Sequence, residues 1–321
     1  MTTEKKEHLN NVLQTHRMAH IQELLSKYES RRTEVKEKIE QQYKGKIYTP
    51  FNSGSYAKYT AINSKFDLDL VIPFKRDSFS TLEEMFNDLY DFLYEEYNTV
   101  ASLRKQKVSV GIEFFEDENN DVINIDLVPG RELNLESYIE DNKLNLYINS
   151  TYGILESKSY IQTNIQAQID TIKGLNNERS IIRLLKIWKI TNKEKYKSFL
   201  FELITIKAFY QNDISGNLWE KLKSVMEYIR DNVANESFTL KDPGNSNNDV
   251  ISTLDMWERQ LLSSKMKSII ERIESYDENI KLYFPINKDF EEEEKDNNDS
   301  SYGIKDPKIV PSTPPNNQRF G

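Results

Sequence analysis

One stretch of the sequence, residues 54–72, limits the fold more than any other. It begins with Gly54 and Ser55, and eleven residues after Ser55 an alternating segment starts, in which Asp67 and Asp69 stand between apolar residues. A β-strand here would bury the apolar side chains and point both carboxylates to its other face. Two such carboxylates lie about 6–7 Å apart, close enough to share a pair of divalent ions. A glycine beside them lets the backbone approach a phosphate closely, because it has no side chain.

A second alternating segment, residues 122–129, supplies a third aspartate. Asp126 falls on its polar face, and we expect Pro129 to end the strand, since proline cannot donate a backbone hydrogen bond to a sheet. If the two strands are adjacent, Asp126 joins Asp67 and Asp69 beside the glycine-serine turn. We therefore predict a site for metal ions and a nucleotide, in which these three aspartates are both the metal ligands and the catalytic residues.

The residue inventory restricts the chemistry further. The 321 residues include no cysteine, which excludes disulfides, thiolate zinc sites and cysteine nucleophiles. The three histidines, His8, His16 and His20, all fall in an expected N-terminal helix. His16 and His20 are about one helical turn apart without a third ligand, so we interpret them as a solvated helix face and not as a zinc site. Chemistry in the core must therefore use carboxylates and metal ions.

The sequence has no feature of export or membrane insertion. The N-terminus lacks the apolar region of a signal peptide, and no run approaches the ~18 apolar residues of a membrane span. We expect a cytoplasmic protein without a membrane partner. The net charge of −9 argues against a broadly basic surface for nucleic acid.

The order of patterns along the chain predicts four parts. Residues 1–44 have the apolar periodicity of an N-terminal spine of one or two helices, residues 45–160 contain the aspartate-bearing strands, and residues 161–288 are mostly helical. Residues 289–321 are acidic and proline-rich. Such a composition cannot bury a core, so we expect a flexible tail.

A cationic helix is the second informative pattern. Between residues 177 and 190, Arg179, Arg183 and Lys186 recur at helical spacing and form one stripe. A stripe of this kind that faces the aspartates would hold a nucleoside triphosphate. Ser198 is expected to begin the next helix, where its hydroxyl and the free amides attract anions.

These motifs together carry a family resemblance. Gly54-Ser55, Asp67-x-Asp69 and Asp126 resemble the signature of the DNA polymerase β-type nucleotidyltransferases. Residues 54–62, and Ile-Asp-Leu-Val-Pro at 125–129, resemble the CD-NTases, the bacterial relatives of cyclic GMP–AMP synthase that act in CBASS anti-phage systems. The resemblance implies an α+β fold. A nucleotidyltransferase catalytic lobe, with a mixed sheet and helices, is joined to a helical second lobe by a long N-terminal helix.

The resemblance also assigns roles to individual residues. It implies that Lys186 and Ser198 touch the triphosphate together with Ser55, and that Phe199 replaces an aromatic residue that stacks on the base in some relatives. Core burial is the competing interpretation of Phe199. Asp126 is also expected to accept the proton of the attacking hydroxyl, because no histidine is available.

The function implied is that of a Mg²⁺-dependent nucleotidyltransferase with two ions, for which Mn²⁺ is an alternative. It would join NTPs, with ATP among them, into a cyclic di- or trinucleotide and release pyrophosphate; the cyclisation rests on the resemblance alone. Two alternatives remain. One is another enzyme of the superfamily, which adds tails to RNA or adenylylates small molecules or proteins. The other is a catalytically silent sensor of nucleotides or RNA.

Two partners are also expected. An exposed terminal glycine, Gly321, suits a ubiquitin-transferase-like enzyme that conjugates the C-terminus, and a frayed end is the competing interpretation. A basic cluster, Arg31, Arg32, Lys36 and Lys38, would contact an RNA activator, although a solvated helix face is the more ordinary interpretation.

Overall fold

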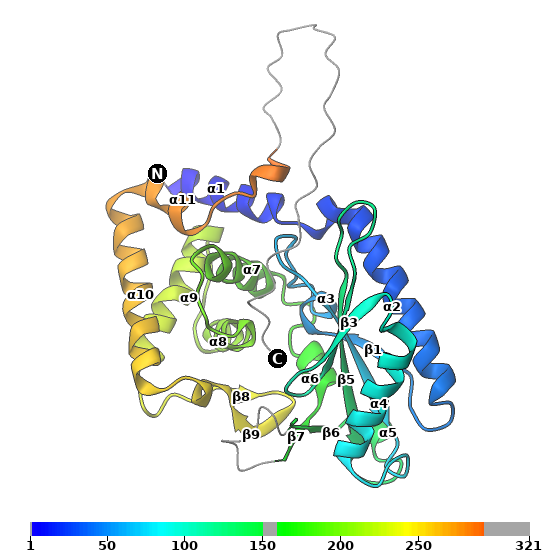
Figure 1. Ribbon diagram of the computed structural model, residues 1–321. Coiled ribbons are helices and arrows are strands. Elements are labelled where there is room, and N and C mark those ends of the chain that lie inside the picture. The colour runs from blue at the N-terminus through cyan, green and yellow to red at the C-terminus, as the bar shows by residue number, and fades with distance from the viewer. Residues whose placement is uncertain (1, 150–158, 292–321) are drawn as a thin grey trace, which may run out of the picture.

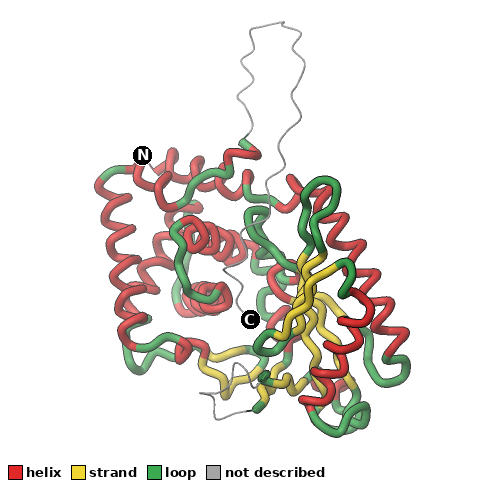
Figure 2. The backbone as a smooth tube through the Cα atoms, viewed as in Figure 1, coloured by secondary structure: helices red, strands yellow, loops and turns green. Residues whose placement is uncertain are grey.

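The computed structural model describes residues 2–149 and 159–291. A sheet with its covering helices and a group of helices lie side by side (Figures 1 and 2). Each half has its own large cluster of buried apolar side chains. The α+β class predicted from the sequence is confirmed.

The sheet half contains a mixed seven-stranded sheet in the described residues. Its strands are β1 (Phe51–Ser53), β2 (Leu68–Phe74), β3 (Ala101–Lys105), β4 (Val110–Phe114), β5 (Asn124–Glu132), β6 (Leu144–Tyr147) and β7 (Tyr160–Thr163). The main order is β1-β2-β5-β4-β3, with β6 and β7 continuing from the end of β5. Among the described strand pairs of this sheet, only β2 and β5 are parallel.

Strand β5 does not end at Pro129, so that expectation was wrong. Residues 124–127 of β5 pair with β4, and residues 130–132 pair with β6. Pro129 lies between these two stretches and has no register partner on that side. Its missing amide therefore removes no hydrogen bond that β4 or β6 needs, and the strand continues.

Two long helices, α2 (Gln22–Gln42) and α4 (Leu82–Tyr97), pack against the sheet. Apolar residues at helical spacing along both of them enter the same buried cluster as the inward side chains of β2 and β5. Thr81 caps α4 by accepting a hydrogen bond from the Glu84 amide. The periodicity of residues 82–97 therefore becomes a helix because one of its faces has a sheet to cover.

The N-terminal segment forms two long helices separated by a short turn. Helix α1 (Thr2–Thr15) ends before an extended Arg17, and a short 3₁₀ turn, η1 (Met18–Ile21), leads into α2. Leu9 and Val12 of α1 belong to the core of the helical half, whereas α2 belongs to the core of the sheet half. The break lets one segment serve two cores.

The expected solvated histidine face is wrong for His16. Its side chain is buried, with 6% of its surface exposed, and its Nδ1 donates to the Val12 carbonyl at 2.8 Å. Burial lowers the pKa of His16, which favours the neutral ring.

The remaining helices form mainly the second half of the molecule. They are α3 (Gly54–Ala57), α5 (Tyr138–Asp141), α6 (Ile165–Asp170), α7 (Asn176–Thr191), α8 (Ser198–Gln211), α9 (Leu218–Asn232), α10 (Met256–Ser275) and α11 (Ile280–Tyr283). Three short 3₁₀ turns, η2 (Val250–Thr253), η3 (Asp277–Asn279) and η4 (Lys288–Phe290), flank α10 and α11 or follow them. A two-stranded sheet of β8 (Lys241–Asp242) and β9 (Asn245–Asp249) lies between α9 and α10. None of the described helices is long and apolar enough to cross a membrane.

The predicted division at residues 44, 160 and 288 stays a prediction. Most of the expected tail, residues 292–321 with Gly321, lies outside the described residues.

Candidate active site

The predicted aspartates lie in one row across the sheet. Asp69 in β2 is directly opposite Asp126 in parallel β5, and Ser53 in β1 is opposite Asp69 from the other side. The row continues from Asp126 to Gly111 in β4 and then to Arg104 in β3. Asp67 comes one residue before β2 begins. Strand register thus brings together acids that are 57 residues apart in the chain.

Gly54 provides close contact between the turn and an aspartate. Its φ of +65° lies in the left-handed region, and a Cβ built on it would be 1.7 Å from Asp69 Oδ2. Only glycine allows the backbone to lie against this carboxylate. Ser55 follows as the second residue of α3, so the glycine-serine turn and Asp69 are immediate neighbours.

Asp69 has an unfavourable environment for an ionised carboxylate. Burial and the neighbouring charges of Asp67 and Asp126 raise its pKa well above the usual value, while Lys58 and Lys186 act in the opposite direction. Three acids whose charges repel one another are typical of a site that binds cations.

Lys58 is a site residue that the sequence reasoning missed. It follows α3, and its ammonium group donates to Glu202 Oε1 of α8 at 2.7 Å; both side chains are buried. The same ammonium group lies 4.7 Å from the centre of the Phe199 ring. In the sequence, only its place in the motif at residues 54–62 could have indicated Lys58. Its partners Phe199 and Glu202 are more than 140 residues away, so no local pattern connects them to it.

Lys186 also reaches this cluster, from helix α7. Its ammonium group donates to the Thr60 carbonyl at 3.0 Å and to the Thr60 hydroxyl at 2.8 Å. Burial lowers the pKa of Lys186 to about 8, and the charges of Glu202 and Asp67 partly offset that effect. Lys186 and Lys58 therefore bring positive charge from the two halves of the molecule to the aspartates.

The other predicted nucleotide-binding residues have different positions. Ser198 begins α8 as expected, and its hydroxyl accepts a hydrogen bond from Lys189 at 3.2 Å. Phe199 packs against the core of the helical half beside Lys58. Arg183 is not brought to the aspartates, because its side chain lines a pocket with residues of α1.

Asp126 is held by a neighbouring amide. Gln106, in the turn between β3 and β4, donates to Asp126 Oδ1 at 2.9 Å, and its own carbonyl accepts from Ser109 at 2.7 Å. A Cβ on Gly111 would be 2.7 Å from Gln106 Nε2 and 3.1 Å from Asp126 Oδ1. The missing side chain of Gly111 thus leaves the space in which Gln106 reaches Asp126.

The carboxylates suit Mg²⁺ or Mn²⁺ in their chemistry, since both are hard cations that prefer oxygen ligands. Within residues 2–149 and 159–291, however, no three acidic or histidine side chains already converge as a metal site. The mutual repulsion that raises the pKa of Asp69 is the observation that fits a cation. Binding would require the side chains of Asp67, Asp69 and Asp126 to turn toward one another.

Much of the basic cluster on α2 is engaged within the protein. Arg31 pairs with Glu34 and covers the Phe114 ring, Lys36 lies 3.8 Å from Glu40, and Lys38 pairs with Glu96. These contacts fit the ordinary interpretation, a solvated helix face.

Comparison with known proteins agrees with this geometry. No protein-family model matches the chain. Two curated Escherichia coli proteins, each named CBASS oligonucleotide cyclase CdnC, are 26% identical over 216 residues, which are 65% of this chain and 66% of theirs. The structure of E. coli MS115-1 CdnC with ATP has a TM-score of 0.64 at 19% identity, covering 86% of this chain and 95% of that one.

The chain is similar to the CD-NTases in sequence and shares their fold. A second structure, Vibrio cholerae DncV cyclic AMP-GMP synthase, has a TM-score of 0.58 at 14% identity and covers 88% of this chain and 84% of that one. The structural matches establish the polymerase β-type nucleotidyltransferase fold that the motifs predicted. The sequence match spans 66% of the length of the curated oligonucleotide cyclases.

Proposed function

We propose that this protein is a metal-dependent nucleotidyltransferase that joins NTPs, with ATP among them, into a cyclic di- or trinucleotide for anti-phage signalling. The row of Asp69 and Asp126, with the Gly54 backbone against one carboxylate and two lysines nearby, is the observation that carries the proposal. The names of the similar proteins, an oligonucleotide cyclase and a cyclic AMP-GMP synthase, support the cyclic product.

Binding of the triphosphate would fall to the cationic side chains. Lys58 and Lys186 both act on the charge of Asp69, so a triphosphate bound beside the aspartates would lie within their influence. Both side chains are buried, and a lysine that has left water gains strongly from an anionic ligand. Ser55, next to Gly54, would place its hydroxyl on the β- and γ-phosphates, and Ser198 would assist.

Asp67, Asp69 and Asp126 would hold two Mg²⁺ ions, or Mn²⁺ in their place. When bound, such ions lower the pKa of the acceptor hydroxyl and stabilise charge on the α-phosphate and the leaving pyrophosphate. Asp126 would accept the hydroxyl proton, and Gln106 would hold its carboxylate in position for this. The hydroxyl oxygen then bonds to the α-phosphorus while the bond from that phosphorus to the bridging oxygen breaks.

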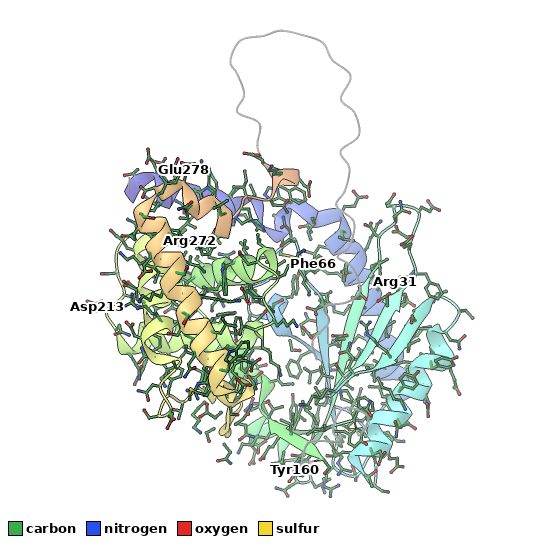
Figure 3. The ribbon with its side chains drawn as sticks, turned by 60° about the vertical axis from the view of Figure 1, so that its left-hand side comes forward. Arg31, Phe66, Tyr160, Asp213, Arg272 and Glu278 are labelled. Carbon is green, nitrogen blue, oxygen red and sulfur yellow. The ribbon has the colours of Figure 1, made fainter. Side chains whose placement is uncertain are left out.

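Product analysis tests the proposal. Purified protein is incubated with Mg²⁺ and labelled ATP, GTP, CTP and UTP, treated with phosphatase and examined by mass spectrometry. Asp67→Asn/Asp69→Asn should abolish the product, and Asp213→Asn, at an exposed position between α8 and α9 (Figure 3), is the matched control that should keep it.

Phosphatase-resistant products without terminal phosphates would establish the cyclic synthase and name its bases. Long linear tails or adenylylated acceptors would show a different superfamily enzyme. NTP binding without pyrophosphate release would favour the silent sensor.

Two regulatory partners remain proposals. A ubiquitin-transferase-like enzyme would act on Gly321, and an RNA activator would contact the basic cluster on α2. Replacing Gly321 with glutamate should prevent conjugation when the transferase is supplied, and adducts that persist would exclude this role.

A further inference from the structure

A polar cavity of about 680 Å³ lies between α1 and α7. In Figure 1, α1 crosses above α7 at the top of the helical half. The polar residues that line the cavity are Asn10, Asn11, Gln14, Arg17, Ser180 and Arg183, and no acidic side chain of the described residues lines it. Its volume falls in the range of about 300–1,000 Å³ that small-molecule sites occupy.

The two arginines of this cavity are close together and lack an acidic partner. Neither Arg17 nor Arg183 forms an ion pair with a carboxylate in the described part of the chain. The Arg183 side chain makes a long contact, 3.4 Å, to the Ser180 hydroxyl. The Nε of Arg183 is buried and has no hydrogen-bond partner among residues 2–149 and 159–291. A buried donor left in this state costs roughly 1–3 kcal/mol, more for a charged group.

The positive charge of Arg183 is also in unfavourable electrostatic surroundings. Burial lowers the pKa of Arg183, and the charges of Arg17 and Arg179 lower it further. Surface arginines commonly relieve such repulsion through a neighbouring acid or by full solvation. No described acid pairs with the guanidinium group of Arg183, so the described residues leave its charge without a negative partner.

The shape of the donors indicates the ligand. A guanidinium group presents its N–H donors as a planar fork that matches the oxygens of a phosphate, and the surrounding amides and hydroxyl add neutral donors. A phosphate monoester carries about −1.5 to −2 charge at pH 7, which is close to the charge of two arginines. A carboxylate carries half of that charge and offers fewer acceptor oxygens.

We propose that the cavity between α1 and α7 binds the phosphate group of a small phosphorylated metabolite, held by Arg17 and Arg183. This site is separate from the aspartates: Lys186, less than one turn further along α7, bonds instead to Thr60. The proposal does not depend on the nucleotidyltransferase activity, because it rests on the charge and geometry of the cavity alone.

Binding to the full-length protein tests the proposal. Inorganic phosphate, AMP and succinate are titrated separately by calorimetry, with EDTA present to remove metal ions from the aspartates. We expect saturable binding of phosphate and AMP, and binding at least tenfold weaker in Arg17→Gln and in Arg183→Gln. Lys6→Gln removes one positive charge from an exposed position of α1 outside the cavity and should bind as the wild type does.

The thermal stability of the variants provides a second readout. Without added anion, Arg183→Gln should melt no lower than the wild type, because it removes a half-buried charge that no described acid pairs. Phosphate should raise the melting temperature of the wild type and leave that of Arg183→Gln unchanged. A lower melting temperature of the variant without phosphate would mean that Arg183 has a partner within the protein.

Three results would overturn the proposal. They are an absence of saturable phosphate binding, equal affinity of the wild type and Arg17→Gln, and succinate binding as tight as that of phosphate. The last result would assign the cavity to a carboxylate.

Discussion

The contact between Gly54 and Asp69 gives the sharpest test of how the site is built. Replacing Gly54 with alanine has two separate effects. A residue other than glycine in the left-handed region costs roughly 1–2 kcal/mol. In addition, the new methyl group would occupy space 1.7 Å from Asp69 Oδ2, so the carboxylate or the turn must move.

Gly45 separates these effects. Its φ is +82°, and a Cβ built there would meet no atom within 4 Å. Gly45→Ala should therefore lose only the backbone contribution, about 1 kcal/mol after the entropy that alanine removes from the unfolded chain. Gly54→Ala should lose a further 1–3 kcal/mol or so, the usual cost of forcing extra atoms into a packed place.

Activity should separate the two variants more strongly than stability does. Moving a catalytic carboxylate by about 1 Å commonly costs about 100-fold in rate. We expect Gly54→Ala to release pyrophosphate at about 1% of the wild-type rate or less, and Gly45→Ala to keep most of that rate. Urea unfolding gives the stabilities, and a coupled pyrophosphate assay gives the rates.

The Asp69→Ala background completes the comparison. Without the carboxylate, Gly54→Ala should cost little more than Gly45→Ala, because the contact that opposes the methyl group is largely gone. Equal stability losses for Gly54→Ala and Gly45→Ala in the wild-type background, with activity kept in both, would refute this account of the turn.

Three further predictions concern the charged groups around the aspartates. Lys58→Met should destabilise the protein by about 3–5 kcal/mol in urea unfolding, because it leaves the buried Glu202 unpaired, and adding Glu202→Leu should restore most of the loss. The folded protein holds Lys186 with a pKa of about 8, below its ordinary 10.5, so the unfolded chain binds more protons between these pH values. Stability should therefore rise with pH across that window, and less steeply in Lys186→Met; equal slopes would contradict the assignment. Gln106→Leu should raise the Mg²⁺ concentration for half-maximal activity by about tenfold while the fold stays intact, since an outer partner of Asp126 is lost; an unchanged requirement would remove Gln106 from this role.

The strands and their acids were predictable because their signal is local. Alternation over a few residues determines which side chains of a strand share a face. Asp69 and Asp126 lie on the strand faces that this alternation predicts. The apolar spacing of residues 82–97 is local in the same way, and the structure has helix α4 there. Local sequence does not determine where this helix begins, since Ser80 and Thr81 both suit an N-cap and the structure uses Thr81.

The cationic side chains of helix α7 show what a local sequence pattern cannot predict, namely their tertiary partners. Arg179, Arg183 and Lys186 occupy one stripe of α7, as their spacing required. Helix α7 lies between several elements, however, so Arg179 covers the Tyr59 ring, Arg183 faces α1 and Lys186 reaches Thr60. Periodicity gives the angle of a side chain around its own helix axis and says nothing about which element stands there.

The break between α1 and α2 has a similar origin. The apolar period runs through residues 9–43 almost without interruption, and nothing in it shows that two cores share the segment. The break appears because Leu9 and Val12 must face one core and Val35 and Ile39 the other. Only the tertiary arrangement supplies that requirement.

The candidate active site lies where the sheet core and the helical core meet, and its buried carboxylates and lysines are in electrostatically unfavourable surroundings. Asp69 belongs to a strand of the sheet core, whereas Lys186 and Glu202 belong to helices of the other core, and Lys58 connects the two. Without a ligand, the acids repel one another and Lys186 loses part of its affinity for a proton. Both conflicts would be relieved by a cation on the acids and an anion on the lysines. A metal-bound triphosphate supplies both charges at once, which is why the electrostatics of these buried groups points to the same ligand as the sequence motifs.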